Sequence, residues 1–333
     1  MTEARQALLD AAAVVPHTDA DGLAAGAIAL RERGEDASAA VLLGRGETPF
    51  SADAPLPSGP LAVLDWGVRP IGRDGVLVDH HVPVVGVGAD GRLGGMAPHG
   101  DPSAAGPRPL VVSSYGEEQE VPTAPLVRRE LAPSAPAWLA AVGAVGDLGD
   151  AGFSLPECAG FGTKTHVRKL VSLVNAPRRL PDGPVREALG MLVDAPDARA
   201  ALADPRVDLL SAAKAEWQAE LERVVRTPPE MVGSRVALVR FASRAQVHPL
   251  VAVRWKGRLK PRVVLAANDG YLRPGVVNFA VRGGEEGEDL RALLQRALPD
   301  ARGSEFANGH DRATGGSLDE DEFARLLAGL SEL

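Results

Sequence analysis

The sequence predicts an α/β protein in which a parallel-sheet N-terminal domain and a smaller α/β C-terminal domain are joined by a helical connector. The length of 333 residues exceeds what one hydrophobic core usually serves. The first part alternates short apolar runs with helix-like stretches, a pattern typical of a parallel sheet with crossover helices. The pattern then turns helical and later strand-rich. We therefore expect domains at 1–185 and 229–333, with the connector at 186–228.

In the first domain, short apolar runs predict buried strands. A helix is expected over 22–34, where good helix formers end at a glycine. The stretch 84–109 is rich in glycine and proline and predicts a loop, while 135–150 and 166–179 predict helices. The expected strands lie at 11–15, 39–43, 61–66 and 75–81, with a further one at 109–116.

The rest of the chain begins with helical periodicity at 184–205 and 207–225. From about residue 230 the sequence becomes strand-rich, and the chain returns to helix at its end. The expected strands are 234–241, 248–255, 261–269 and 275–283, and the expected final helices are 288–298 and 319–330.

Composition excludes several classes of protein. The net charge of −8 argues against wholesale non-specific binding to nucleic acid, although a local basic groove remains compatible with it. A single cysteine, Cys158, excludes an intramolecular disulfide and a cysteine-rich zinc site, which fits a reducing compartment. We find neither a signal peptide nor an apolar run of the roughly 18 residues that a membrane span needs. The expected location is the cytoplasm.

Ionisable residues follow several of the apolar runs. In open α/β sheets, ligand sites lie beyond the carboxyl ends of the strands, so these side chains are expected to meet at one edge of the sheet. The residues are His17, Asp19 and Asp21 after the first run, Asp65 after the run at 61–64, Asp79, His80 and His81 after 75–78, and Asp147 after 140–145.

This set of donors suits a pair of octahedral divalent ions. Carboxylate and imidazole groups favour Mn²⁺ or Mg²⁺ over soft metals, and two such ions can clamp an in-line phosphoryl displacement. A carboxylate must bridge the ions, and Asp65, alone in its motif, is the candidate. Taken alone, the motif at 17–22 is often only a polar turn. Asp150 competes with Asp147, which is preferred because it follows the apolar run directly.

The motifs resemble those of a known family. "HTDADG", "LDWG", "VDHH" and "GAVGDLGD" are similar, in order, to four motifs of the DHH phosphoesterase family, and "DADG" resembles its RecJ-like branch. "VNFAVRG" at 277–283 and "NGHDRATGG" at 308–316 resemble the family's C-terminal domain, and "LVNAPRR" at 173–179 resembles a RecJ segment. The resemblance covers nearly the whole chain.

The resemblance implies a role for each motif residue. Two divalent ions are implied, Mn²⁺ first and Mg²⁺ as the other candidate. His81 would face the substrate phosphate, either polarising it or protonating the leaving oxygen, and Asp79 would orient His80. One ion would be held by His17, Asp19 and Asp65, and the other by Asp21, Asp65, His80 and Asp147.

The C-terminal domain would bind the substrate. Arginine and histidine would meet its phosphate, and glycines would let the backbone approach closely. Ala307 and Asn308 stand where the family has a longer glycine run, so the shape of this phosphate cradle departs from the family pattern. The residues implied are Arg282, His310, Arg312, Gly315 and Gly316.

The function implied is a RecJ-like exonuclease. A hydroxide activated by two metals would hydrolyse phosphodiester bonds of single-stranded DNA or RNA, or of short oligonucleotides. Aromatic stacking platforms are few, which favours short substrates: Trp66, Tyr115, Trp255 and Tyr271. The alternatives are a phosphodiesterase for cyclic dinucleotides, nanoRNA or 3′-phosphoadenosine phosphate, and a non-catalytic nucleotide-binding protein. No membrane partner is expected, and the oligomeric state stays open, a homodimer included.

Overall fold

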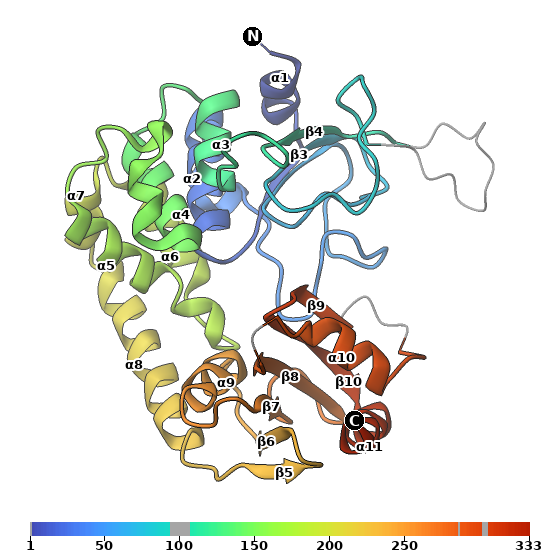
Figure 1. Ribbon diagram of the computed structural model, residues 1–333. Coiled ribbons are helices and arrows are strands. Elements are labelled where there is room, and N and C mark those ends of the chain that lie inside the picture. Colours follow the sequence, from blue (N-terminus) through green and yellow to red (C-terminus); the bar gives the residue numbers. More distant parts are fainter. Residues whose placement is uncertain (1, 94–106, 286, 302–305) are drawn as a thin grey trace. The chain divides into compact units, whose positions relative to one another are not determined.

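The protein forms two compact units. Figure 1 shows the computed structural model, which describes residues 2–93, 107–285, 287–301 and 306–333. The first unit contains Met1–Arg178 and Asp182–Ala213, and the second contains Arg179–Pro181 and Lys214–Leu333. Each unit combines a sheet with helices, which confirms the predicted α/β class. The division falls within one long helix, α8 (Arg206–Val224).

The sheet of the first unit is parallel, as predicted. Its order is β1-β2-β3-β4, and apolar side chains cover both faces, as is usual for a parallel sheet. The predicted strand at 39–43 is wrong. Ala37–Ala39 form a 3₁₀ turn, and Ala40 makes only an isolated bridge to Val14. The strands are β1 (Ala13–Pro16), β2 (Leu61–Leu64), β3 (Gly75–Asp79) and β4 (Leu110–Ser113).

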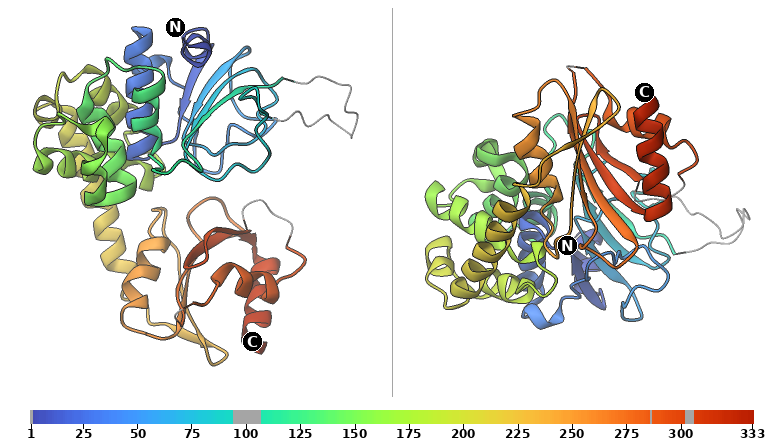
Figure 2. Two further views of the ribbon diagram at one scale, coloured as in Figure 1. Left: turned by 45° about the horizontal axis from the view of Figure 1, so that its top comes forward. Right: turned by 90° about the horizontal axis from the view of Figure 1, so that it is seen from below.

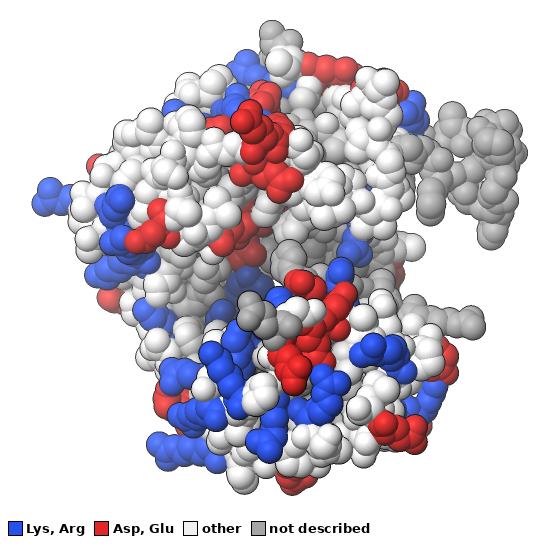
Figure 3. Space-filling view, in the orientation of Figure 1, with Lys and Arg blue, Asp and Glu red and all other residues white. Residues whose placement is uncertain are grey.

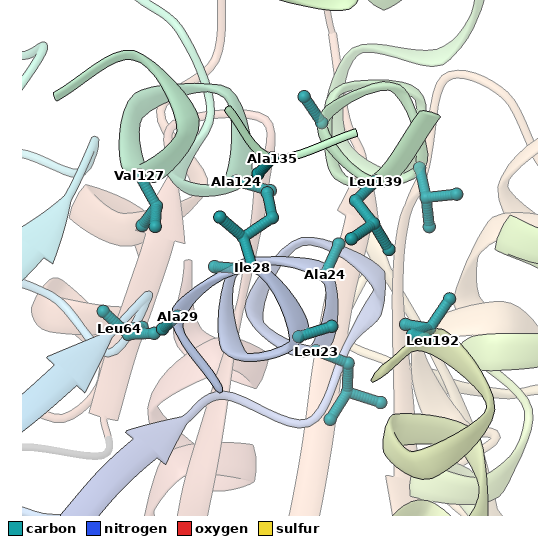
Figure 4. Packing of buried hydrophobic residues seen from close by; sticks show 14 of the residues in the cluster. Leu23, Ala24, Ile28, Ala29, Leu64, Ala124, Val127, Ala135, Leu139 and Leu192 are labelled. Carbon is teal, nitrogen blue, oxygen red and sulfur yellow. The ribbon is translucent and has the colours of Figure 1, made fainter. Parts of the chain in front are cut away.

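The helices of the first unit pack around α2. Ile28 of α2 lies between Leu64 of β2 and the side chains of Val127 and Leu139 from two other helices, in an alanine-rich core where backbones approach closely (Figure 4). None of the described helices combines the length and apolar character needed to cross a membrane. The helices are α1 (Glu3–Leu9), α2 (Ala20–Arg33), α3 (Thr123–Glu130), α4 (Ala137–Leu148), α5 (Lys164–Val174), α6 (Val185–Asp194) and α7 (Ala198–Leu202).

Part of the expected connector belongs to the first unit. Leu189 and Leu192 of α6 and Ala201 of α7 are buried in the core around α2. These apolar faces explain the placement, because helices with a buried stripe pack against other elements. Within the expected connector at 186–228, α8 is therefore the helix that runs from one unit into the other.

The second unit is built on a mixed sheet. Its order is β5-β6-β7-β8-β10-β9, and helix α9 covers one face while α10 and α11 cover the other (Figure 2). The strands are β5 (Glu230–Val232), β6 (Val236–Phe241), β7 (Val263–Asn268), β8 (Val276–Gly283), β9 (Phe306–His310) and β10 (Ala313–Asp319). The helices are α9 (His248–Lys256), α10 (Leu290–Ala297) and α11 (Glu320–Glu332).

The predicted strand at 248–255 is wrong, since this segment is α9. Pro249 lies in the first turn of the helix, where a missing N–H costs no hydrogen bond. Val251 and Ala252 are buried while Val253 is 49% exposed, so burial does not alternate as it would in a strand. The apolar run alone could not distinguish the two structures.

Candidate metal centre

Histidine and aspartate side chains meet at the carboxyl-terminal edge of the parallel sheet. His17 and Asp19 follow β1, Asp65 follows β2, and His80 follows β3, while Asp147 comes from the last turn of α4. Because the first three strands run parallel, their ends lie at the same edge. Ligand atoms lie within 4.8 Å of one another in three groups: His17, Asp19 and Asp65; Asp21, His80 and Asp147; and Asp65, His80 and His81.

Asp65 lies between the first two groups. Its Oδ2 is 3.8 Å from Nδ1 of His17, and its Oδ1 is 3.5 Å from Nε2 of His80. The side chain is almost fully buried, and the residue adopts a φ of 69°, in the left-handed region. Residues held in such conformations cluster at functional sites. Asp65 therefore contacts both His17 and His80, and its role as a bridging carboxylate stays a prediction.

Asp21 is held in place by the start of α3. Its two carboxylate oxygens accept the backbone N–H groups of Thr123 and Ala124, at 2.6 and 2.8 Å. A helix N-terminus favours such an anion. Gly143 of α4 leaves room for it, because a Cβ there would lie 2.3 Å from Oδ1 of Asp21. Asp21 therefore depends on two helices for its position.

His80 and Asp147 complete the second group. Nε2 of His80 lies 3.1 Å from Oδ2 of Asp147. Asp150, the alternative to Asp147, instead forms an exposed ion pair with Arg168 of α5. The structure thus places Asp147 in the cluster and Asp150 outside it.

Carboxyl groups are crowded together in this cluster. Burial raises the pKa of both Asp21 and Asp65 well above the usual value, and neighbouring carboxylates raise it further. Nδ1 of His17 and Nε2 of His80 are buried, and neither makes a well-aligned hydrogen bond with a described residue. Crowded carboxylates with imidazole nitrogens between them fit divalent cations, which would neutralise the former and bind the latter.

Asp19 differs from its neighbours. Burial opposes its ionisation, but His17 and the guanidinium of Arg178 together hold its pKa well below the usual range. Nη1 of Arg178 donates to Oδ2 of Asp19 at 3.0 Å. Asp19 also begins α2, where its Oδ1 accepts the N–H of Gly22. The same carboxylate therefore starts a helix and joins the cluster.

Asp79 contacts His81 rather than His80, the residue it was expected to orient. Its Oδ1 accepts the backbone N–H of His81 at 2.7 Å and lies 2.8 Å from Nδ1 of the His81 ring, while its Oδ2 accepts the N–H of Gly67. Burial opposes ionisation, yet these partners lower the pKa of Asp79. An ionised Asp79 thus fixes the loops after β2 and β3 together.

Sequence reasoning missed three supporting side chains. Thr123 donates its hydroxyl to Oδ1 of Asp65 at 2.8 Å, and Asn175 accepts the N–H of Ala20, the first residue of α2. Arg178 is the third. The motif at 173–179 had drawn attention to Asn175 and Arg178 without giving either a contact, and Thr123 stands among apolar residues with no signal of its own.

A pocket of about 290 Å³ opens onto the cluster. Its wall combines the candidate metal ligands with uncharged and basic side chains from the loops after β2 and β3. The lining residues are His17, Asp19, Asp65, Trp66, Gly67, Arg69, His81, Val82, Val84 and Asp147.

In the second unit, the predicted substrate-binding arginines bond to the backbone. Nη1 of Arg282 donates to the carbonyl oxygens of Val281 and Thr314, at 2.8 and 3.1 Å, and burial lowers its pKa. Nη1 of Arg312 donates to the carbonyl of Glu285. Both guanidinium groups therefore donate hydrogen bonds to backbone carbonyls of the sheet and of its adjoining loop.

The predicted histidine and glycines lie in the β9–β10 hairpin. Gly315 has a packing reason to be glycine, since a Cβ there would lie 2.3 Å from the carbonyl oxygen of Phe279 on β8. Gly316 lies where the register of β10 against β9 shifts. The side chain of His310 lies outside the described residues, as does that of Asn308.

The second unit also presents a basic segment at 254–262. Lys and Arg gather over α9 and the neighbouring strands (Figure 3). The guanidinium of Arg258 lies 5.1 Å from the ring centroid of Trp255, and among the described residues only Arg254 of this segment pairs with a carboxylate, that of Glu222. The basic residues of the segment are Arg254, Lys256, Arg258, Lys260 and Arg262.

Comparison with solved structures identifies the fold. An exonuclease RecJ bound to manganese superposes with a TM-score of 0.59 at 21% identity, over 100% of this chain and 95% of that one. RecJ from Thermus thermophilus in complex with Mn²⁺ gives 0.63 at 22% identity, over 99% of this chain and 54% of that one. This chain thus spans about half the length of the Thermus protein. The DHH domain of a protein described as a member of a ribosomal-protein family gives 0.56 at 14% identity, over 99% and 89%.

These likenesses confirm the predicted fold. The chain has the RecJ-like DHH fold, with its parallel-sheet unit and its second α/β unit. No protein-family model and no curated protein matches the sequence.

Proposed function

We propose that this protein is a metal-dependent phosphodiesterase that hydrolyses single-stranded nucleic acid or short oligonucleotides. The observation that carries the proposal is the cluster of four carboxylates and three imidazoles that includes Asp65, at one edge of the parallel sheet of a RecJ-like fold. The RecJ structure is described as an exonuclease bound to manganese, and we extend that class of activity to this chain.

Two divalent ions would occupy the cluster. His17, Asp19 and Asp65 would hold one, and Asp21, Asp65, His80 and Asp147 the other. Bound there, Mn²⁺ or Mg²⁺ supplies Lewis acidity and a strong nucleophile at neutral pH. The Thermus RecJ has been solved with either ion, so both are candidates here.

His81 would transfer the proton. Its Nδ1 is engaged by Asp79, and its side chain is 56% exposed and lines the pocket. A carboxylate that fixes one ring nitrogen leaves the other free to exchange a proton with a substrate. We therefore propose that His81 donates to the leaving oxygen and that Asp79 holds its ring.

The basic segment at 254–262 supports a substrate rich in phosphate. Its closely spaced cations and the stacked Trp255 suit a strand with charged backbone and exposed bases. In the same unit we propose substrate contacts by Arg282, His310 and Arg312, near the glycines at 315 and 316. The substrate class thus rests on both units.

The test is a time course on 5′-labelled single strands of DNA and RNA, from dinucleotides to about 30-mers, with Mn²⁺, with Mg²⁺ or with EDTA. We expect metal-dependent cleavage that Asp65→Asn abolishes. Asp150→Asn is the matched control, since that residue pairs with Arg168 away from the cluster. Retained cleavage by Asp65→Asn would contradict the proposed site.

The product pattern decides the substrate. A ladder on long strands indicates a RecJ-like exonuclease, whereas cleavage of the shortest lengths alone indicates an enzyme for short oligonucleotides. If no strand is cleaved with either metal, the proposal is wrong. Cyclic dinucleotides and 3′-phosphoadenosine phosphate are then the next substrates to test, followed by nucleotide binding without turnover.

A further inference from the structure

The pocket wall includes an arginine, Arg69, that pairs with no acidic residue in the described part of the chain. The guanidinium of Arg69 lies 5.7 Å from the ring centroid of Phe50, and its buried Nε makes no hydrogen bond. Among the described residues no carboxylate pairs with Arg69, although most of the chain's arginines on this unit do pair or bond to carbonyls. Arg69 is half-buried, and a buried polar nitrogen without a hydrogen-bond partner costs free energy that a ligand could recover.

Arg69 shares its pocket with the carboxylates of the metal centre. Asp19, Asp65 and Asp147 line the same cavity of about 290 Å³. If cations occupy the cluster, an anion placed between them and Arg69 is attracted from both sides. The planar guanidinium fork matches the oxygens of a phosphate group.

An apolar lip adjoins Arg69. Val82 and Val84 line the pocket with 64% and 63% of their surface exposed, which is unusual for two neighbouring aliphatic side chains. Trp66 lines it as well, with its ring edge-on to His17 at a centroid distance of 4.9 Å. Flat apolar surfaces of this kind suit the ribose and base of a nucleotide.

The loops that carry these residues are tied together. The N–H of Val84 donates to the carbonyl oxygen of Val68 at 3.1 Å, and Asp79 accepts the N–H groups of Gly67 and His81. Val68 itself is fully buried. The two backbone segments that carry the arginine and the lip are therefore tied to each other, which reduces the ordering needed on binding.

We infer that Arg69, Trp66, Val82 and Val84 form a subsite for one nucleotide unit, in which Arg69 binds the phosphate and the apolar lip covers the ribose and base. The inference deepens the proposed function, since it assigns to the first unit's own pocket a selection for nucleotides over other phosphodiesters. It assigns these residues binding and positioning roles.

The test measures binding rather than turnover. Adenosine 5′-monophosphate and inorganic phosphate are titrated calorimetrically into the full chain with saturating Mn²⁺. We expect Arg69→Met to weaken both ligands roughly 10- to 100-fold, the range for a lost charge-assisted pair. Arg69→Lys should restore part of the affinity. Val82→Ser/Val84→Ser should weaken the nucleotide and leave inorganic phosphate unchanged.

Arg73→Met is the matched control, because Arg73 lies four residues further along and bonds to the carbonyl of Pro57 outside the pocket. Unchanged nucleotide affinity in Arg69→Met, an equal loss in Arg73→Met, or no nucleotide binding by the wild type would each overturn the subsite. Mn²⁺ affinity should be equal in all variants. Failure of the proposed function is a separate result: a wild type that binds the nucleotide through Arg69 but cleaves no strand keeps the subsite and loses the activity.

Discussion

Oδ1 of Asp79 lies 2.8 Å from Nδ1 of His81, and the same oxygen accepts the backbone N–H of His81. The carboxylate thus fixes both the ring and the main chain of the residue that follows His80, a candidate metal ligand. Its other oxygen reaches across to the N–H of Gly67 on the neighbouring loop.

The first prediction concerns this pair. Asp79→Asn should lower kcat roughly 10- to 100-fold, as the loss of a group that orients a functional side chain does, with a smaller effect on KM. Mn²⁺-dependent hydrolysis of a dinucleotide measures it. If Asp79 acts through His81, the double variant with His81→Gln should be no slower than His81→Gln alone. Additive losses would contradict that role.

The second prediction concerns the charge on Asp65. Its raised pKa means that the folded protein binds the proton more tightly than the unfolded chain does, so folding stability without metal falls as pH rises above the usual aspartate range. Asp65→Asn should therefore stabilise the metal-free protein at neutral pH, by about 1 kcal/mol or roughly 2–4 °C. The variant should also lose most of the stabilisation that Mn²⁺ gives the wild type. Thermal unfolding with and without Mn²⁺ tests both, and Asp150→Asn should change neither.

The third prediction concerns pH and metal affinity. Burial opposes protonation of His80, but Asp147 and the nearby Asp21 hold its pKa above 6.5. Protonated His80 therefore stabilises the folded, metal-free protein below pH 6.5. This contribution to the free energy of unfolding is lost as the pH rises through the raised pKa of His80. Since a metal ligand must be deprotonated, Mn²⁺ affinity should rise with pH across the same window, with proton release. Titration calorimetry in two buffers of different ionisation enthalpy counts the protons. Proton release unchanged in His80→Asn would contradict this assignment, and His166→Gln is the control.

The fourth prediction concerns the space beside Asp21. Gly143→Ala would place a methyl group 2.3 Å from Oδ1 of Asp21 and 2.5 Å from the Cβ of Ala124. We expect destabilisation of about 1–3 kcal/mol and weaker Mn²⁺ binding, because α4 or the carboxylate must shift. Chemical denaturation and metal titration measure the two effects. Gly86→Ala is the control, since no atom lies within 4 Å of a Cβ there.

The strands that carry the site could be predicted because their apolar runs end abruptly in charged residues, as at 61–65 and 75–79. The run at 39–43 looked similar, yet Ala40 makes only one bridge to Val14. Apolar character predicts burial, whereas strand pairing also needs a neighbouring edge with matching register. At 248–255 the apolar run suggested a strand. The segment is a helix instead, with Pro249 in its first turn and two consecutive buried residues at 251–252.

The candidate metal ligands could be named from the sequence because each comes shortly after an apolar run. The residues that hold these ligands in position could not be named from the sequence. The bond from Thr123 to Asp21 spans 102 residues, and that from Ala20 to Asn175 spans 155. Contacts at such separations depend on how the helices pack, which local patterns do not encode. The pairing of Asp79 with His81 rather than His80 likewise follows from the turn after β3.

The left-handed backbone of Asp65 restricts what evolution or an engineer can place there. Asparagine and glycine tolerate this conformation, while most other side chains would add strain of about 1 kcal/mol or more to any loss of the carboxylate. A chain that kept this architecture but abandoned its chemistry would therefore most easily do so through asparagine or glycine at this position. Such an exchange would leave a well-folded protein with an intact pocket, available for recognition without reaction.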